Sequence, residues 1–298
     1  MSGEPIKVGA KKARDFRERY GPVALVTGAA QGIGRAFADS VAARGLSVLM
    51  VDVQEEALDV AAREVAETYE VSTWAVPTDL ARRDFLGGID AICSRVGLEV
   101  GLVICNAALG LEGPFLEADL ETLHRAEDVS CHATTALAHH FGRGMAERGR
   151  GGLLFVSSGT ALQGAPNHAH YAATKAFVLV LGESLWYELQ PKGVDVLAFV
   201  PGPTNTPGLR SSLTDLEEGV AVGPIGLPRD TAETAVDALG KKATAARERV
   251  HANRLASRRR AADEFVEHQA KQREPTDAPA AAPSSAAPEG GGEGGDVE

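Results

Sequence analysis

Tyr171 and Lys175 are the two residues whose types and spacing point most directly to chemistry. They are four positions apart at the start of an apolar stretch, residues 171–190, that predicts a helix, so both side chains lie on one helix face. An ammonium beside a phenol stabilises the phenolate, and each unit of pKa lowering is worth about 1.4 kcal/mol. Such a tyrosine acts as a general acid and base nearer neutral pH. The same spacing is also common on helices without any catalytic role.

A serine pair precedes these two residues. Ser157 and Ser158 follow the apolar run 153–156, and Ser158 stands 13 positions before Tyr171. Ligands gather at the carboxyl ends of the strands in a parallel sheet. The sequence therefore predicts that Ser158 lies beside the Tyr171 and Lys175 pair.

The elements that must position these residues alternate between strands and helices. Short aliphatic and β-branched runs without polar alternation predict a parallel sheet that is covered by helices on both faces. This is a doubly wound α/β fold of the Rossmann type, expected as a single domain. A seventh strand is expected after Leu239, although the Ala- and Arg-rich sequence there does not mark it. The six runs that predict strands are residues 23–27, 48–51, 73–76, 102–105, 153–156 and 194–200.

A glycine-rich loop follows the first predicted strand and opens a helix. Residues 27–34 read TGAAQGIG. Glycines there permit a tight turn and the close approach of a pyrophosphate to the helix N-terminus, although a turn can also need glycine for its geometry alone. Asp52 ends the second predicted strand, 24 positions beyond Gly28. A carboxylate at this place accepts hydrogen bonds from both adenosine ribose hydroxyls and repels a 2′-phosphate, so NAD is favoured over NADP as the cofactor.

With these motifs in place, the sequence over residues 20–239 resembles the short-chain dehydrogenase/reductase family. The flanks RYGPVALVTGA and GESLWYEL are similar to its branch of 3-oxoacyl and 17β-hydroxysteroid reductases. The resemblance implies that Ser158 polarises the substrate oxygen, that Tyr171 transfers the proton, and that Lys175 lowers the Tyr171 pKa and binds the nicotinamide ribose. The cofactor-binding residues that it implies are Gly28, Gln31, Gly32, Ile33, Gly34, Asp52, Asp79, Leu80, Asn106, Ala107, Ala108, Tyr171, Lys175, Pro201, Gly202, Thr204 and Thr206.

Two positions depart from the family pattern. Ser130 stands where the family usually has a catalytic Asn. Because that residue holds a water largely through its backbone carbonyl, Ser130 is included with the catalytic residues, and an impaired or rewired proton relay is expected. Ala108 replaces a usual Gly and adds a methyl near the cofactor.

Composition sets limits on the partners. The formal charge of -11 gives no reason to expect nucleic acid binding. No apolar run is long enough to span a membrane, and no apolar segment follows the basic N-terminus as in a secretory signal, so a cytoplasmic location is expected. We expect a charged extension at residues 1–19, a dehydrogenase domain at 20–240, a basic helical extension at 241–273 and a disordered acidic tail at 274–298. The basic run 258–260 fits a solvated helix face better than a nucleic-acid patch.

Other polar residues carry weaker signals. Cys93, Cys105 and Cys131 match neither a disulfide framework nor a zinc motif, and no metal site is predicted. His168 and His170 either line the mouth of a substrate site or are merely solvated. Residues 205–228 are expected to form a mobile lid that governs substrate choice.

Three functions compete on these observations. The first is an NAD-dependent oxidoreductase that interconverts a secondary alcohol and a ketone on a small, apolar hydroxy or keto substrate. The second is a dinucleotide-binding sensor or scaffold without catalysis, which the retained Ser158, Tyr171 and Lys175 disfavour. The third, an epimerase or dehydratase, is disfavoured because the loop has three residues and then one between its glycines. A homo-oligomer, dimer or tetramer, is expected because the helix at 171–190 is apolar around most of its girth.

Overall fold

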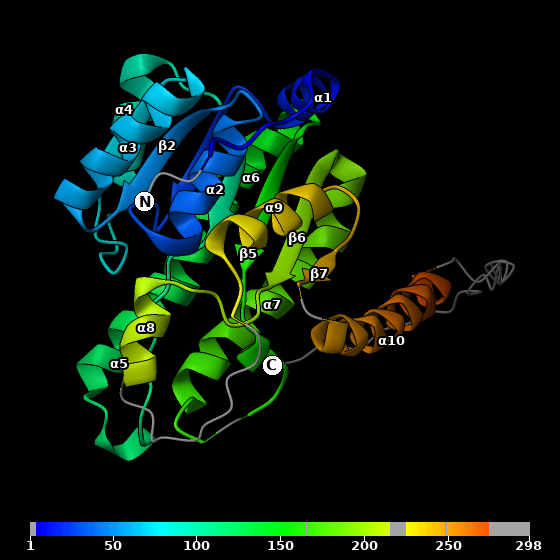
Figure 1. Cartoon of the computed structure of the whole chain (residues 1–298). Helices are drawn as coiled ribbons and strands as arrows, with labels where there is room; N and C mark the ends of the chain where they lie inside the picture. Colours follow the sequence, from blue (N-terminus) through cyan, green and yellow to red (C-terminus); the bar gives the residue numbers. More distant parts are fainter. Residues whose placement is uncertain (1–3, 165, 215–224, 248, 274–298) are drawn as a thin grey trace, which may run out of the picture. The chain divides into compact units, whose positions relative to one another are not determined.

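The computed structural model of the chain describes residues 4–164, 166–214, 225–247 and 249–273 (Figure 1). The expected acidic tail at 274–298 and the middle of the expected lid, residues 215–224, lie outside the described residues. The first compact unit ends at Ser257 and the second begins at Arg258. The expected boundary at residue 240 therefore falls inside the first unit.

The described residues form one parallel sheet of seven strands in the order β3-β2-β1-β4-β5-β6-β7. This order confirms the doubly wound α/β fold. The strands are β1 (Val23–Thr27), β2 (Ser47–Asp52), β3 (Thr73–Pro77), β4 (Val100–Cys105), β5 (Gly151–Val156), β6 (Val194–Val200) and β7 (Thr244–Ala246).

Helices cover both faces of the sheet (Figure 1). One buried cluster joins α2, α3 and α9 to the sheet face that includes Val26, and the other joins α4, α6 and α7 to the face that includes Leu25. The helices are α1 (Ala10–Tyr20), α2 (Gly32–Ala42), α3 (Glu55–Tyr69), α4 (Leu86–Val96), α5 (Leu120–Glu127), α6 (Ala133–Arg148), α7 (Ala169–Leu189), α8 (Pro207–Thr214), α9 (Pro228–Ala238) and α10 (Arg249–Arg273).

Glycine is the second residue of both β4 and β5, because the end of α1 fills the space that a side chain would need there. A Cβ on Gly101 would lie 2.4 Å from the carbonyl oxygen of Tyr20, and a Cβ on Gly152 would lie 2.9 Å from the Tyr20 ring. Tyr20 is buried at the end of α1. The helix expected only as a charged extension is therefore packed against the sheet.

The strand order reverses direction between β1 and β4, which are neighbours in the sheet. In a doubly wound fold the loops at the carboxyl edge diverge at this switch point and leave a crevice for a ligand. The loops after β1, β4, β5 and β6 all leave the sheet at that edge. They carry the glycine loop, Asn106, Ser158 and Pro201.

Candidate active site

The glycine loop after β1 has the geometry of a phosphate cradle. Gly28 and Gly32 have φ values of +67° and +60°, in the region that side chains disfavour. A Cβ on Gly34 would lie 1.9 Å from the carbonyl oxygen of Gly28, so the first turn of α2 packs directly on the loop. The free amides and the positive dipole end of α2 favour an anion there. Gln31 is exposed at this end, and Ile33 packs against the core. The exposed helix end with its free amides suits an anion such as a pyrophosphate.

The loop after β4 is tied to the glycine loop by hydrogen bonds. The Thr27 hydroxyl oxygen accepts from the backbone N–H groups of Asn106 and Ala107 at 3.0 and 3.1 Å. The Asn106 side chain donates back to the carbonyl oxygen of Thr27 at 3.0 Å. The structure therefore places Asn106 and Ala107 beside the glycine loop.

Asp52 lies at the end of β2 with its carboxylate held in place. Its Oδ2 accepts from the backbone N–H of Ala30 at 3.0 Å, and its Oδ1 accepts from that of Gln54 at 3.0 Å. The Ala30 bond places the carboxylate against the glycine loop. Arg35, the nearest basic residue after the loop in sequence, is paired with Glu64 at 2.8 Å and lies 3.4 Å from a carboxylate oxygen of Asp39.

Asp79 and Leu80 follow β3 and differ in exposure. The Asp79 carboxylate accepts from the Ala81 backbone at 3.0 Å and from Arg125 on α5 at 2.9 Å. Partial burial acts to raise the pKa of Asp79, but these two hydrogen bonds and the Arg125 charge hold it below its ordinary value. The Leu80 side chain is buried in the core. Asp79 therefore offers a fixed carboxylate, whereas Leu80 offers only its backbone to a ligand.

The loop after β6 also meets the glycine loop. A Cβ on Gly32 would lie 3.2 Å from the Thr206 methyl, so Thr206 sits against the start of α2. The Thr206 hydroxyl accepts from the backbone N–H of Leu209 at 3.1 Å. Thr204 is buried, donates to the Gly202 carbonyl at 2.9 Å and lies 3.2 Å from the Thr231 hydroxyl on α9. The Thr204 side chain thus faces the protein, whereas Thr206 borders the phosphate cradle near Pro201 and Gly202.

Tyr171 and Ser158 form the centre of the site. Tyr171 lies in the first turn of α7 with its side chain partly buried, and the Ser158 side chain lies close to its phenol. Burial raises the pKa of Tyr171 above its ordinary value, and the nearby Ser158 hydroxyl opposes this only in part. The Ser158 oxygen accepts from the Thr160 N–H at 3.3 Å and from the Thr160 hydroxyl at 3.0 Å. With its acceptor positions occupied, Ser158 has its own hydrogen left to donate.

Thr160 was not among the residues that the sequence predicts. The signal that points to it is a hydroxyl residue two positions after a serine at the end of a strand, a spacing that permits a side-chain to backbone hydrogen bond. Thr160 orients Ser158 by donating two hydrogen bonds to its hydroxyl oxygen.

Lys175 is buried one turn beyond Tyr171 and is fixed at two points. Its Nζ donates to the carbonyl oxygen of Val156 at 2.8 Å, and its own carbonyl accepts from the Ser157 hydroxyl at 2.8 Å. Burial lowers the pKa of Lys175 to about 8. The Nζ lies 5.9 Å from the centroid of the Tyr171 ring. The pKa of Tyr171 is raised in this structure, where a lowering was expected, because burial dominates at the phenol.

Ser130 lies in a π-helical turn, Asp128–His132, between α5 and α6. Such turns often occur at functional sites. The Ser130 side chain is buried, and its hydroxyl oxygen has no hydrogen-bond partner among the described residues. The next residue, Cys131, places its sulfur 4.0 Å from the Thr174 carbonyl on α7. The turn therefore packs against α7 beside Lys175. Burial raises the pKa of the Cys131 thiol to about 11, so that thiol is neutral.

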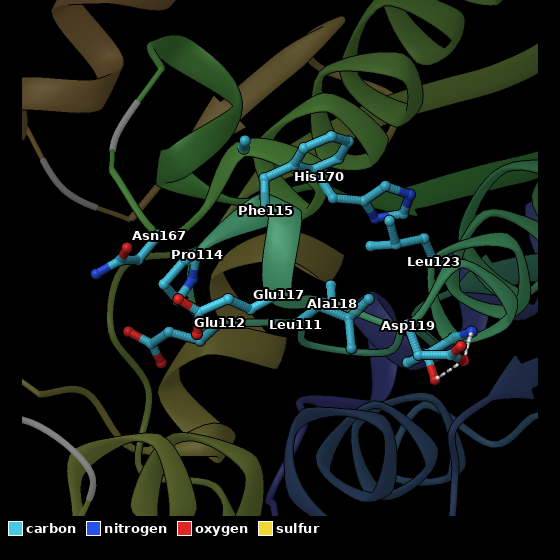
Figure 2. Close-up of a pocket in the computed structure, with 13 residues that line it drawn as sticks. Leu111, Glu112, Pro114, Phe115, Glu117, Ala118, Asp119, Leu123, Asn167 and His170 are labelled. Atoms are coloured by element: carbon cyan, nitrogen blue, oxygen red, sulfur yellow. Dashed lines mark hydrogen bonds between the residues drawn. The ribbon is translucent and has the colours of Figure 1, made fainter.

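A cavity of about 310 Å³ lies next to the start of α7 (Figure 2). Its lining includes His170 together with Phe115 and Leu123. The His170 Nε2 lies 3.1 Å from a carboxylate oxygen of Glu127, and the His168 Nε2 lies 3.2 Å from a carboxylate oxygen of Glu112. Of the two histidines that the sequence left open, His170 lines this cavity. No cluster of three metal-ligating side chains occurs within the described ranges, and there every helix is too short or too polar to span a bilayer.

Known proteins share this arrangement. A family model described as short chain dehydrogenase matches residues 22–217. A 7β-hydroxysteroid dehydrogenase of Collinsella aerofaciens is 34% identical over 230 residues, which cover 76% of this chain and 86% of that protein. The human inactive hydroxysteroid dehydrogenase-like protein 1 is 31% identical over 191 residues, which cover 63% of this chain and 57% of that protein.

Solved structures agree with these relatives. A structure from work on 7β-hydroxysteroid dehydrogenase stereoselectivity matches with a TM-score of 0.73 and 33% identity, covering 80% of this chain and 92% of that one. A short-chain dehydrogenase from Sphingobium yanoikuyae, in complex with NADPH, matches with a TM-score of 0.71 and 25% identity, covering 88% of this chain and 99% of that one. The chain belongs to the short-chain dehydrogenase/reductase family and is one of its oxidoreductases.

Proposed function

We propose that the protein is an NAD-dependent dehydrogenase that interconverts a secondary alcohol and a ketone on a hydroxysteroid-type substrate. The observation that carries this proposal is the placement of the Ser158 hydroxyl beside the Tyr171 phenol, with the Lys175 ammonium one turn away. A neutral hydroxyl donor and a phenol on one side of a carbonyl oxygen are the groups that its reduction to an alcohol needs.

Ser158 and Tyr171 divide the work on the substrate oxygen. A bound nicotinamide dinucleotide supplies the hydride for reduction or accepts it in oxidation. In reduction, the Ser158 hydroxyl donates a hydrogen bond to the carbonyl oxygen, and the Tyr171 phenol gives that oxygen its proton. In oxidation, the ionised Tyr171 takes the proton from the alcohol. The raised pKa of Tyr171 keeps the phenol protonated at neutral pH and favours the reducing direction there.

Lys175 and Ser130 would return the proton to Tyr171. The Lys175 ammonium is buried and, with a pKa of about 8, can exchange a proton close to neutral pH. The unpartnered hydroxyl of Ser130 lies in the turn that packs beside it. We assign Ser130 to the relay in place of the usual Asn, with a water between it and Lys175.

The residues that would hold the dinucleotide lie along the switch point. The amides of the loop at Gly28, Gly32 and Gly34 suit the pyrophosphate, and Asp52 suits the adenosine ribose. Asp79 suits the adenine side and Thr206 the phosphate or carboxamide. The fixed Asp52 carboxylate supports NAD over NADP, while a relative of known structure binds NADPH.

The proposed substrate class rests on the relatives that are named for hydroxysteroids. We also propose a cytoplasmic location, which the three free thiols of Cys93, Cys105 and Cys131 support.

Replacing Tyr171 by Phe tests the proposal. The change removes one oxygen and keeps the ring, so NADH binding, followed by fluorescence, should survive. Turnover of hydroxysteroids should fall by about 10²- to 10⁴-fold, the usual contribution of a positioned acid or base. The unmodified protein should oxidise alcohols faster as pH rises, because the phenol must ionise, and the variant should lose this dependence. Undiminished turnover in Tyr171→Phe would overturn the mechanism.

A dinucleotide-binding sensor is the second candidate. Two observations favour it: Ser130 in the place of Asn, and relatives that are named inactive. A screen of the purified protein with NAD⁺ against secondary alcohols and hydroxysteroids, read as NADH absorbance, separates the two functions. NADH binding without turnover of any alcohol or ketone would place the sensor first.

A further inference from the structure

The start of α10 packs on the turn next to Ser158, the serine of the proposed mechanism. This turn, Gly159–Leu162, follows Ser158 directly, and α10 begins some ninety residues later in the chain. The contacts come from residues before Ser257 and therefore lie within the first compact unit. We propose that three residues in the first two turns of α10, His251, Arg254 and Leu255, position Ser158 for catalysis.

Leu255 makes the apolar part of this contact. Its side chain is buried in a small cluster with Leu179 of α7 and Val200 of β6, and Ala161 and Leu162 of the turn pack against that cluster. The side chain is only 3% exposed, although the residues around it on α10 face solvent. Leu255 therefore connects the turn after Ser158 to α7, which carries Tyr171, and to β6.

Two further residues of α10 hold the turn at its ends. Arg254 donates from Nη1 to the side-chain oxygen of Gln163 at 2.8 Å. The ring of His251 lies against the backbone of Gly159, where a Cβ would come within 2.6 Å of the ring carbon Cε1. α10 therefore contacts the turn at Gly159, at Ala161 and Leu162, and at Gln163 directly after it.

The position of this turn reaches Ser158 through Thr160. Thr160 lies in the middle of the turn, and both its N–H and its hydroxyl donate to the Ser158 oxygen. Because both bonds are accepted by the Ser158 oxygen, the Ser158 hydrogen is left to donate to a group other than Thr160. A shift of the turn would move both donors together, and a shift of about 1 Å in a catalytic group can reduce a rate about 100-fold. His251, Arg254 and Leu255 act through Thr160 and are positioning residues.

The inference rests on the proposed function for its kinetic part only. Hydrogen–deuterium exchange of the peptide that covers residues 159–163 tests the positional part without any turnover. Leu255→Ala should increase deuterium uptake in this peptide, whereas Asn253→Ala, a change at an exposed neighbour on α10, should not. Arg254→Ala, which removes no buried packing, repeats the test if Leu255→Ala does not fold.

The kinetic part compares the same variants with a hydroxysteroid that the unmodified protein turns over. Leu255→Ala and Arg254→Ala should lower kcat by about 10- to 100-fold, while the Kd for NADH and the KM stay within twofold. Arg254→Lys should recover part of the rate. In a double-mutant cycle, Arg254→Ala and Gln163→Ala should be strongly non-additive because they remove the same hydrogen bond.

The outcomes separate the two proposals. Increased uptake in Leu255→Ala, together with an unmodified protein that turns over no alcohol, would leave the positioning role in place and remove the proposed function. Normal uptake and normal kcat in both α10 variants would overturn the positioning role. So would a loss of kcat that is matched by an equal loss of NADH binding or by a fall in Tm to the assay temperature.

Discussion

The burial of Lys175, which the proposed mechanism uses, comes at a cost to the stability of the fold. The side chain is 4% exposed, and burial lowers its pKa from 10.5 to about 8. Between these two pH values the unfolded chain holds a proton that the folded chain has released. The stability of the folded protein therefore rises with pH across this window, and the full cost of burying the ammonium is present below pH 8.

Replacing Lys175 by Met should make this cost visible. Met fills a similar volume without a charge, and the unpaired Val156 carbonyl that remains costs about 1 to 3 kcal/mol at every pH. The free energy of unfolding of the variant relative to the unmodified protein should fall by up to about 3 kcal/mol as pH rises from 8 to 10.5, equal to the pKa difference. Urea unfolding at several pH values measures it. A difference that stays constant with pH would contradict the buried charge.

Asp52 should decide the choice between the two dinucleotides. Its carboxylate is fixed by the Ala30 and Gln54 amides, and Arg35 is paired with Glu64, so a 2′-phosphate would meet a negative charge. We expect NADH to bind at least tenfold more tightly than NADPH, about 1.4 kcal/mol. Asp52→Ala should narrow this ratio. Both dissociation constants are measured by fluorescence titration. A lower dissociation constant for NADPH than for NADH in the unmodified protein would contradict the prediction.

At the scale of elements, the sequence predicts the long apolar strands but neither the shortest strand nor the contacts between distant segments. The six predicted runs match β1 to β6 within two residues at each end, because buried parallel strands are apolar throughout. β7 was hidden because its three residues, Thr244–Ala246, are no more apolar than the helices around them. The π-turn at Ser130 and the contact of Leu255 with Leu162 depend on packing between distant segments, which periodicity does not record.

The docking of α1 on the sheet should contribute strongly to stability. Asp195 on β6 is 6% exposed and accepts from Arg19 and from the Tyr20 hydroxyl, the latter at 2.6 Å. Asp195→Ala should lower the free energy of unfolding by about 2 to 3 kcal/mol, because it leaves a buried hydroxyl and an arginine without their partner. Lys12 lies on the same helix as Arg19, and Lys12→Ala removes only an exposed ion pair with Asp237 of α9, so it should cost less than about 1 kcal/mol. Equal losses in urea unfolding would refute the assignment.

At the scale of the whole molecule, an apolar groove between α6 and α7 favours self-association. The groove has a volume of about 430 Å³ and includes Leu181 and Leu185. Charges of both signs border it: Arg143 and Glu147 on α6, Glu188 on α7, and Lys192 three residues beyond the end of α7. Such a face can complement its own copy across a twofold axis. Phe177 and Val180 of α7 are also exposed.

We therefore expect a homo-oligomer of the 31.1 kDa chain. Light scattering should give a mass of two or four chains, and Val180→Glu should shift it toward the monomer because it places a charge in the apolar contact. Val60→Glu, on α3, is the matched control with a similar exposure, 46% against 49%. A monomer in the unmodified protein, or an equal effect of both substitutions, would exclude this face as the contact.

The hydroxyl of Thr27 has a consequence for the thermodynamics of ligand binding. It joins the ends of β1 and β4 by accepting from two successive amides and donating to the Ile104 carbonyl at 3.3 Å. The two walls of the dinucleotide crevice are therefore connected to each other in the free protein. A ligand that enters does not have to order these walls, and the entropy that such ordering consumes has already been spent during folding. The part of the binding free energy that depends on ordering these two walls is therefore determined when the sheet forms.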